Sequence, residues 1–247
     1  MVPVRKEPTH RSEMVNQLLF ADTYTVLNEQ TGWLRVVATH DEYEGWINAS
    51  QHFATTPKEL QLLQSADRAI AYDLVCTVPG SSTPVLVTAG STLPAFDGLN
   101  FRLGKERLVY NGKAIPAEPA NLSMIEKLTN RFLGVPYLWG GRSPFGIDCS
   151  GFTQVVFKYL GVALKRDAYQ QAEQGFIVNF INETKPGDLA FFANEEGKIT
   201  HVGIVLKDQQ IIHASGVVRV DRLDHFGIFN TSTNKYTHQL KIIKRLT

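Results

Sequence analysis

The sequence contains only two cysteines, Cys76 and Cys149, among its 247 residues. They could form at most one disulfide bridge, and no two cysteines have the close spacing of a metal-binding motif. This usage excludes a disulfide-stabilised scaffold and is typical of a reducing compartment. Cys76 lies in the apolar run AYDLVCTVPG, where we expect a buried, reduced thiol.

The sequence also lacks long apolar runs and an excess of charge of either sign. No stretch is long enough to cross a bilayer as a helix. The formal net charge is +1, and neither half has a dense basic block, which argues against nucleic acid or an anionic membrane as the main partner. The first residues lack the apolar stretch of a secretory signal, so we expect a cytoplasmic protein. An exported protein from which a signal has been removed is the alternative.

What the sequence does contain differs between its two halves. The N-terminal half consists of short β-branched and aromatic runs separated by turn residues, which predicts strands in small barrels. We expect one barrel in 1–58, with Trp33 and Trp46 in its core, and a second in 59–118. The segment 54–66 between them fits a short linker or a helical turn.

From residue 119 onward the pattern changes to helices followed by strands. The segment 121–134 reads as an amphipathic helix that Gly134 ends, with Asn121 or Ser123 at its cap. A second helix should end at Gly161, and its apolar spacing of three and four residues runs through Phe152, Val155, Val156, Tyr159 and Leu160. Five strand-like runs follow, so we predict an α+β domain over 119–247.

The segment GIDCSGFTQ places Cys149 at the start of this second helix, with Asp148 as the candidate N-cap. The positive end of a helix dipole lowers the pKa of a thiol and favours the thiolate. The free N–H groups of a first turn could also bind the oxyanion of an acyl-transfer intermediate. Cys149 is therefore a candidate nucleophile, and a structural cysteine that happens to follow a loop is the alternative.

A cysteine nucleophile needs a base, and the base needs a group that orients it. His201 and His213 lie in two consecutive apolar strands, where an imidazole is uncommon. We assign the base to His201 and its orientation to His213, and two core histidines bonded to backbone carbonyls are the alternative. The other five histidines lie in polar stretches, where we expect them to be solvated: His10, His40, His52, His225 and His238.

The two histidines can act on one thiol only if they lie on the same face of the sheet, and strand register decides this. A three-residue loop at Lys207–Gln209 places His213 opposite Gly203, two residues from His201 and on the same face. A four-residue loop without a bulge sends the rings to opposite faces. We therefore predict an odd loop, or a bulge with the same effect, with both rings beside the start of the Cys149 helix.

Five segments together resemble the NlpC/P60 cysteine peptidases: VPYLWGG, GIDCSGFTQ, KPGDLAFF, HVGIVL and IIHASG. The resemblance covers roughly residues 120–247 and includes the three catalytic blocks in order. Upstream, HRSEMVNQLLFAD and YEGWI resemble the bacterial SH3-type domain that precedes this catalytic domain in peptidases of cell-wall peptide recycling. The family implies a papain-like fold and hydrolysis of the γ-D-glutamyl to diamino-acid bond in peptidoglycan stem peptides.

Carried onto the matching positions, the resemblance implies that Cys149 is the nucleophile, His201 the base and His213 the residue that orients the base. It places Tyr137 of VPYLWGG beside the thiol. It places Asp148 and Ser150 on either side of the nucleophile, with Ser150 binding the substrate carboxylate. These assignments require neither a cofactor nor a metal, and chelators should leave the rate unchanged.

In related enzymes an acid and a tyrosine of the SH3-type domain reach the free amino end of the substrate. Here these positions are Glu13 in RSEM and Tyr43 in DEYEGW, and Asp167 in KRDAYQQ would join them at the ammonium. A free α-amino group is largely charged at pH 7, so two carboxylates and a phenol suit it. The serine of the family's Arg-Asp-Ser motif is Ala168 here, which removes one hydroxyl from the binding of the substrate carboxylate.

The predicted fold is α+β, a papain-like catalytic domain preceded by two small SH3-like β-barrels. The predicted function is that of a monomeric cysteine peptidase acting on a murein peptide with a free N-terminal L-Ala, whose diamino acid is meso-diaminopimelate or L-Lys. Two other functions stay open on the sequence: a different papain-like amidase or acyltransferase, and a cell-wall-binding module with an inactive catalytic domain. The intact set Cys149, His201 and His213 argues against the binding module.

Overall fold

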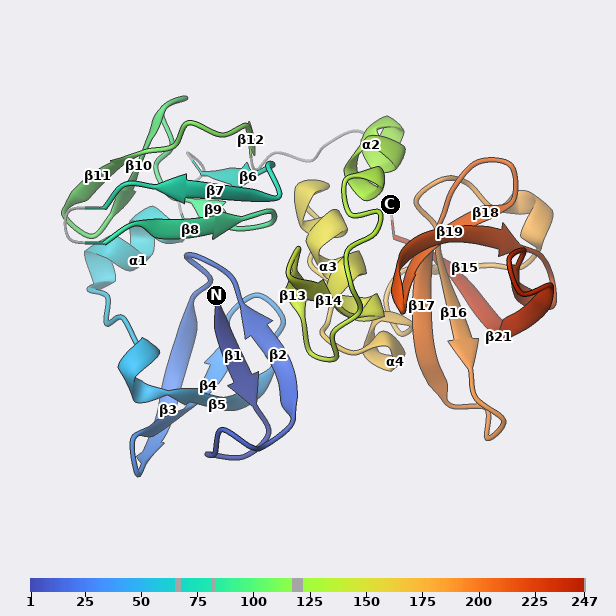
Figure 1. The fold of residues 1–247 in the computed structure, drawn as a ribbon, viewed down its shortest axis with the longest axis horizontal. Helices are drawn as coiled ribbons and strands as arrows, with labels where there is room; N and C mark the ends of the chain where they lie inside the picture. Colours follow the sequence, from blue (N-terminus) through green and yellow to red (C-terminus); the bar gives the residue numbers. More distant parts are fainter. Residues whose placement is uncertain (65–67, 81–82, 117–121, 247) are drawn as a thin grey trace. The chain divides into compact units, whose positions relative to one another are not determined.

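The computed structural model describes residues 1–64, 68–80, 83–116 and 122–246 of the chain, which forms two compact units (Figure 1). The first unit comprises Met1–Pro119 and Trp139–Pro144, and the second comprises Ala120–Leu138 and Phe145–Thr247. The predicted boundary at 118–119 and the candidate cap Asn121 lie outside the described residues. Within the described ranges, no helix is long and apolar enough to cross a membrane.

The N-terminal part of the first unit is a five-stranded antiparallel sheet in the order β2-β1-β5-β4-β3. Its strands are β1 (Val2–Arg5), β2 (Met14–Leu18), β3 (Tyr24–Gln30), β4 (Trp33–Ala38) and β5 (Glu44–Asn48), and a short 3-10 turn, η1 (Ala49–Gln51), follows. Val36 and Ile47 are fully buried in its core. Trp33 is buried as predicted. Trp46 is only half-buried, because it alternates with Ile47 and points to the other face of β5.

The rest of the first unit begins with a helix, α1 (Pro57–Gln64), in the segment predicted as a linker or helical turn. Short strands follow: β6 (Ala69–Ala71), β7 (Val75–Val78), β8 (Val85–Thr88), β9 (Thr92–Leu93), β10 (Asn100–Leu103), β11 (Glu106–Val109) and β12 (Ala114–Pro116). They form the sheet β12-β6-β9 and the hairpins β7-β8 and β10-β11 around Phe101 and Tyr110. Cys76 forms no disulfide and is half-buried rather than buried; among the described residues, its strand β7 pairs with β8 alone.

In the second unit, the helix predicted over 121–134 is shorter than expected. The chain forms a 3-10 turn, η2 (Leu122–Met124), and then α2 (Ile125–Asn130). Met124 is at the N-cap of α2 and offers no side-chain acceptor, so the first turn has no capping bond. Gly134 has a φ of +81°, but α2 already ends at Asn130 with Arg131 as its C-cap, so Gly134 does not end the helix as predicted.

The helix that carries the cysteine, α3 (Cys149–Tyr159), begins and ends where the sequence predicted. The Asp148 carboxylate accepts a hydrogen bond from the N–H of Gly151 at 2.7 Å, and Gly161 follows the helix with a φ of +72°. The predicted apolar face is buried along its whole length. A short helix, α4 (Ala168–Gln171), and a 3-10 turn, η3 (Ile181–Glu183), follow.

The second unit also contains a seven-stranded antiparallel sheet in the order β15-β21-β16-β17-β18-β19-β20. Its strands are β15 (Phe176–Val178), β16 (Leu189–Ala193), β17 (Ile199–Val205), β18 (Gln210–Ser215), β19 (Val217–Leu223), β20 (Gly227–Asn230) and β21 (Lys235–Arg245). The long strand β21 pairs with β16 and also with β20, so β16 to β21 close into a ring (Figure 1). Two shorter strands are β13 (Arg142–Ser143) in the first unit and β14 (Gly146–Ile147) in the second.

The inner face of this ring has an apolar end and a polar end. Val205, Ile211 and Leu223 belong to its apolar core, near the β17–β18 hairpin loop. Because side chains alternate along a strand, His201 and His213 lie on the same face as Val205 and Ile211. Both β17 and β18 contact α3. The sheet therefore brings the predicted catalytic strands to the start of the cysteine helix.

Candidate active site

Cys149 is the first residue of α3 and is 5% exposed. The ladder between β17 and β18 contains only the pairs Ile204–Ile212 and Val205–Ile211, and the strands separate beyond them. There the backbone N–H of Val202 donates to the sulfur of Cys149. The thiol thus lies at the opening between the two strands that carry the histidines.

The pKa of the Cys149 thiol is higher than the sequence predicted. Burial, followed by the negative charge of Asp148, raises this pKa to about 12. The N–H of Val202, the guanidinium of Arg166 and the N–H of Ser150 all lower it, but together they do not outweigh burial. The N–H groups near the start of the helix do lower the pKa of the thiol, as expected, but the desolvation of the buried sulfur raises it by more.

The two histidines have the predicted register. Ile204 pairs with Ile212, which sets His213 opposite Gly203 and leaves a three-residue loop at Lys207–Gln209. The Nε2 atom of His201 lies 2.8 Å from Nδ1 of His213. A Cβ atom on Gly203 would lie 3.0 Å from Cβ of His213, so glycine leaves the room that the second ring needs. Both rings lie on one face of the sheet, as predicted.

Asp221 of β19 extends this pair into a chain of four groups. Its Oδ2 atom lies 3.0 Å from Nε2 of His213, and the guanidinium of Arg219 donates to its Oδ1 at 2.9 Å. Burial alone would raise the pKa of Asp221, but the hydrogen bonds from His213 and Arg219 and the charge of Arg219 hold it below its usual value. Asp221 is therefore a carboxylate and can only accept hydrogen bonds.

This carboxylate fixes the tautomers of both imidazoles. Because Asp221 only accepts, His213 donates from Nε2 and leaves a lone pair on Nδ1. His201 must then donate from Nε2 to that lone pair, which leaves its own Nδ1 unprotonated. Burial lowers the pKa of His201 well below 6.5, and the neighbouring His238 and His213 lower it further. The ring is therefore neutral at pH 7 and has the free nitrogen that a general base requires.

The side chains on either side of the thiol belong to a buried ion pair. Arg166 donates from Nη2 to Oδ2 of Asp148 at 2.5 Å and from Nη1 to Oγ of Ser150 at 2.8 Å. The Ser150 hydroxyl in turn contacts Oδ1 of Asp148 at 3.3 Å. Arg166 and Asp148 have almost no exposed side-chain surface. This cluster fixes the start of α3, and the role of Ser150 toward a substrate carboxylate stays a prediction.

Tyr137 lies close enough to Cys149 for the ionised forms of the two groups to repel each other. Burial, followed by the negative charges of a Cys149 thiolate and of Asp148, raises the pKa of Tyr137 above its usual value of 10. The backbone of Tyr137 donates to the carbonyl of Gly216 at 2.9 Å and bridges to Ile147. The phenol is therefore protonated at neutral pH and can donate a hydrogen bond beside the nucleophile.

The three residues expected at the substrate's amino end make different local contacts. Oε1 of Glu13 accepts a hydrogen bond from Nε1 of Trp139 at 2.7 Å. Tyr43 is half-buried, and its backbone N–H donates to Oδ1 of Asp41. Asp167 is the N-cap of α4 and forms a capping box there. Their joint role around an ammonium stays a prediction.

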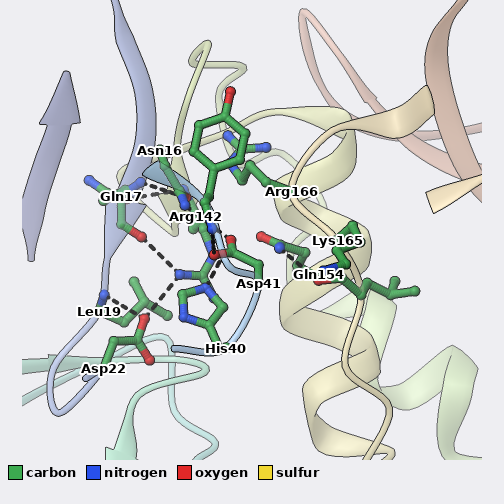
Figure 2. A network of polar contacts seen from close by, with 12 residues as sticks. Asn16, Gln17, Leu19, Asp22, His40, Asp41, Arg142, Gln154, Lys165 and Arg166 are labelled. Carbon is green, nitrogen blue, oxygen red and sulfur yellow. Dashed lines mark hydrogen bonds and ion pairs between the residues drawn. The ribbon is translucent and has the colours of Figure 1, made fainter. Parts of the chain in front are cut away.

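A polar network in the first unit holds the segment 139–144, which begins two residues after Tyr137 (Figure 2). The Nη1 atom of Arg142 donates to the carbonyl of Gln17 at 2.9 Å and to Oδ2 of Asp22 at 3.0 Å. Close by, Nδ2 of Asn16 donates to Oδ2 of Asp41 at 3.0 Å. These buried contacts fix the strand after Glu13 and the turn before Tyr43, the two predicted ammonium ligands of this unit.

Sequence reasoning missed several groups of the site and misjudged one of them. His238 was expected to be solvated, but its imidazole stacks on that of His201 with centroids 4.1 Å apart. The pairing of β21 with β20, which closes the sheet, brings this part of β21 to His201. Asp221 and Arg219 were not singled out, although a carboxylate among the apolar residues of the strand-like run VVRVDRL was a usable signal. Arg166 lies in the segment KRDAYQQ, but the sequence analysis gave it no role.

Comparisons with known proteins agree with this architecture. Residues 134–239 match the model of the NlpC/P60 family, and residues 4–51 match the bacterial dipeptidyl-peptidase SH3 domain. A protein of Bacillus subtilis named gamma-D-glutamyl-L-lysine dipeptidyl-peptidase is 33% identical over 80% of this chain and 71% of its own length. The Bacillus cereus protein of the same name is 28% identical over 83% of this chain and 68% of its own length.

A solved structure supports the fold. An NlpC/P60 family protein from Bacillus cereus superposes with a TM-score of 0.79 at 22% identity, over 94% of this chain and 82% of that one. The fold is accordingly the one predicted, with small SH3-like sheets before a papain-like domain. At this identity the likeness supports the fold alone.

Proposed function

Because the chain belongs to the NlpC/P60 family of cysteine peptidases, we propose that it hydrolyses the γ-D-glutamyl to diamino-acid bond of peptidoglycan stem peptides with a free N-terminal L-Ala. The observation that carries the proposal is the hydrogen-bonded chain from His201 through His213 to Asp221, together with the buried sulfur of Cys149, which accepts the backbone N–H of Val202, the residue next to His201. The names of the two Bacillus relatives support the bond and the substrate class. A dipeptidyl-peptidase releases two residues from a free amino end, which agrees with L-Ala-D-Glu as the product.

In the first half of the reaction, the Cys149 sulfur attacks the γ-carbonyl carbon while its proton passes to Nδ1 of His201. The high pKa of the thiol and the low pKa of the imidazole both favour uncharged groups at rest, so the proton moves as the bond forms. The imidazolium then donates from Nε2 to His213, and Asp221 stabilises the resulting charge through that ring.

The carbonyl oxygen gains negative charge at the same moment. The backbone N–H of Cys149 belongs to the first turn of α3, where the helix supplies no carbonyl partner, so it is available as one donor. The protonated phenol of Tyr137 is the second donor in our proposal. Collapse of the intermediate breaks the C–N bond, and the departing amine takes the proton from His201.

The second half of the reaction regenerates the enzyme. Water attacks the thioester carbonyl, and His201 accepts its proton as it did that of the thiol. The thioester bond breaks, the sulfur leaves, and the proton returns to Cys149. The products are L-Ala-D-Glu and the remainder of the peptide, which begins with the diamino acid.

The amino-end part of the proposal makes a sharp experimental prediction. Glu13, Asp167 and Tyr43 would bind an ammonium, so acetylating the alanine of L-Ala-γ-D-Glu-L-Lys should remove most activity. A lost charge-assisted contact costs about 1.5–3 kcal/mol, or roughly ten- to a hundredfold in kcat/KM. Mass spectrometry of the two peptides, each incubated with the protein, measures both the bond cleaved and the rate.

The outcome separates the parts of the proposal. Cleavage of the free peptide between D-Glu and L-Lys, with a large loss on acetylation, supports bond and pocket together. Equal rates on the free and acetylated peptides would eliminate the ammonium pocket and leave the peptidase. Repeating the assay with meso-diaminopimelate in place of L-Lys determines which diamino acid the enzyme prefers.

A further inference from the structure

Three histidines meet at the polar end of the inner face of the closed sheet β16 to β21. The peptidase mechanism uses only two of them. His238 of β21 stacks on His201 at an interplanar angle of 24° and meets the edge of His213 with centroids 5.6 Å apart. One nitrogen from each ring can be chosen such that all three atoms lie within 4.8 Å of one another. His201 and His213 are buried, whereas His238 is only partly buried and gives this cluster its exposed side.

Hydrogen bonds prepare two of these rings as metal ligands. His213 donates from Nε2 to Asp221 at 3.0 Å, which leaves a lone pair on Nδ1. Nδ1 of His238 lies 2.9 Å from Oγ1 of Thr237, whose hydroxyl donates to the carbonyl of Ile228. His238 must therefore donate from Nδ1, and its Nε2 carries a lone pair. A metal-bound histidine commonly donates its other nitrogen to a carboxylate or another acceptor in this way.

We propose that His201, His213 and His238 form a binding site for a divalent transition metal of the zinc type, and that the metal inhibits the peptidase. The inhibitory consequence rests on the proposed function, whereas the binding does not. An all-imidazole set favours Zn²⁺, Cu²⁺ or Ni²⁺ over Mg²⁺ and Ca²⁺, which prefer oxygen. Three histidines with a fourth position left open are a known zinc arrangement.

The metal would take the place of the proton between the two catalytic histidines. Zinc–nitrogen bonds of about 2.0–2.1 Å put tetrahedral ligands roughly 3.3 Å apart. The His201 and His213 nitrogens, now 2.8 Å apart, would separate slightly, and the His238 ring would move inward. His201 would then bind through Nε2 and carry its proton on Nδ1. In the proposed mechanism Nδ1 of His201 accepts the proton of Cys149, so a protonated Nδ1 would leave the thiol without a base.

Binding can be tested without any turnover, in the Cys149→Ala protein, where the thiol cannot contribute. Titration with Zn²⁺ against a chromophoric chelator should give one site per chain. His238→Gln, and His238→Phe, which keeps a stacked ring, should each weaken binding by at least roughly tenfold, because a ligand is lost. His225→Gln removes an exposed histidine outside the cluster and should leave the affinity unchanged. Equal affinity in all four proteins, or no binding in Cys149→Ala, would overturn the proposal.

Co²⁺ gives a readout that needs no His238 variant. A tetrahedral nitrogen set produces intense visible absorption, whereas an ion bound weakly at the surface as an octahedral complex does not. Intense bands that titrate to one equivalent support the site, and their absence contradicts it. In the wild-type enzyme, Zn²⁺ should stop peptide hydrolysis with a midpoint equal to its dissociation constant, and a chelator should restore the rate. Binding without inhibition would refute the regulatory part alone, and absent peptidase activity would leave the binding result standing.

Discussion

At the scale of single residues, the direction of each hydrogen bond determines what the site can do. The Asp221 carboxylate sets the tautomer of His213, which sets that of His201 and leaves Nδ1 free to take the thiol proton. The sequence singled out Cys149, His201 and His213 as candidates, because a cysteine at a helix start and imidazoles in apolar strands stand out. It did not identify Asp221, because the pairing of β18 with β19 that brings it to His213 depends on a register that no local signal fixes.

Asp221→Asn should reduce kcat with little change in KM. An amide can donate to His213, which reverses the preferred tautomers and removes the charge that stabilises the imidazolium. General base catalysis is worth about 10²–10⁴ in rate. A group that acts through a second ring should cost less, on the order of ten- to a hundredfold. Steady-state kinetics measure this.

Asp224→Asn is the matched control, since Asp224 lies three residues further along and bonds to the Tyr236 hydroxyl, outside the chain of groups. It should leave kcat near the wild-type value. If both variants lose activity equally, or if Asp221→Asn loses none, Asp221 does not position the base.

The pH dependence of kcat, measured at saturating substrate so that the titration of the free substrate's α-amino group does not enter, should show a flat region from about pH 6.5 to 9. His201 accepts the proton only when it is neutral, and its lowered pKa moves the loss of activity on acidification well below pH 6.5. The Cys149 pKa of about 12 means that the rate gains nothing from thiol ionisation in this range. An ordinary thiol with a pKa near 8.5 would instead make the rate rise through pH 8–9. Such a rise would contradict the uncharged resting pair.

At the scale of elements, the β17–β18 hairpin and the start of α3 carry the site. Both could be predicted from the sequence. Side chains alternate between the two faces of a strand, so the length of the hairpin loop decides which residues share a face. An N-cap residue marks the first turn of a helix. The weaker predictions concerned short or isolated signals. The segment Gly227–Asn230 lies outside the five strand-like runs, yet it forms β20, and the helix predicted over 121–134 begins only at Ile125. Long-range pairing decides such short segments more strongly than local preference does.

Gly203→Ala should lower both stability and activity. The added Cβ would lie 2.7 Å from Cδ1 of Ile211 and 3.0 Å from Cβ of His213, so either β18 or the ring must shift. Overpacking of this kind costs about 1–3 kcal/mol of unfolding free energy. A displaced His213 would also lose its 2.8 Å contact with His201 and lower kcat. Thermal unfolding and peptide hydrolysis measure the two effects.

Gly197→Ala provides the comparison. Gly197 has a φ of +78° in a loop, so alanine there costs about 1–2 kcal/mol through backbone strain without crowding either histidine. Its kcat should match the wild type at temperatures where both proteins are folded. A normal kcat in Gly203→Ala would show that this close approach does not position the ring.

At the scale of the whole molecule, the sequence pattern changes near residue 119 from short strand-like runs to helices followed by strands. This change was enough to predict an α+β catalytic domain after small β-sheet domains. The fold comparison agrees with this class. Two features could not be predicted. Closure of the sheet requires β21 to pair with both β16 and β20 through shifts in register, and it alone brings His238 to the site. The grouping of Trp139–Pro144 with the first unit follows from Arg142, whose buried partners are distant in sequence.

The central claim is that Cys149 is the nucleophile of a peptidase, and rapid acid quenching during hydrolysis of L-Ala-γ-D-Glu-L-Lys tests it most directly. Intact-protein mass spectrometry should then show an L-Ala-γ-D-glutamyl adduct, and peptide mapping should place it on Cys149. Cys149→Ala should show neither the adduct nor hydrolysis, and His201→Ala should lose hydrolysis with its fold intact. An adduct on another residue, or turnover retained by Cys149→Ala, would contradict the cysteine mechanism.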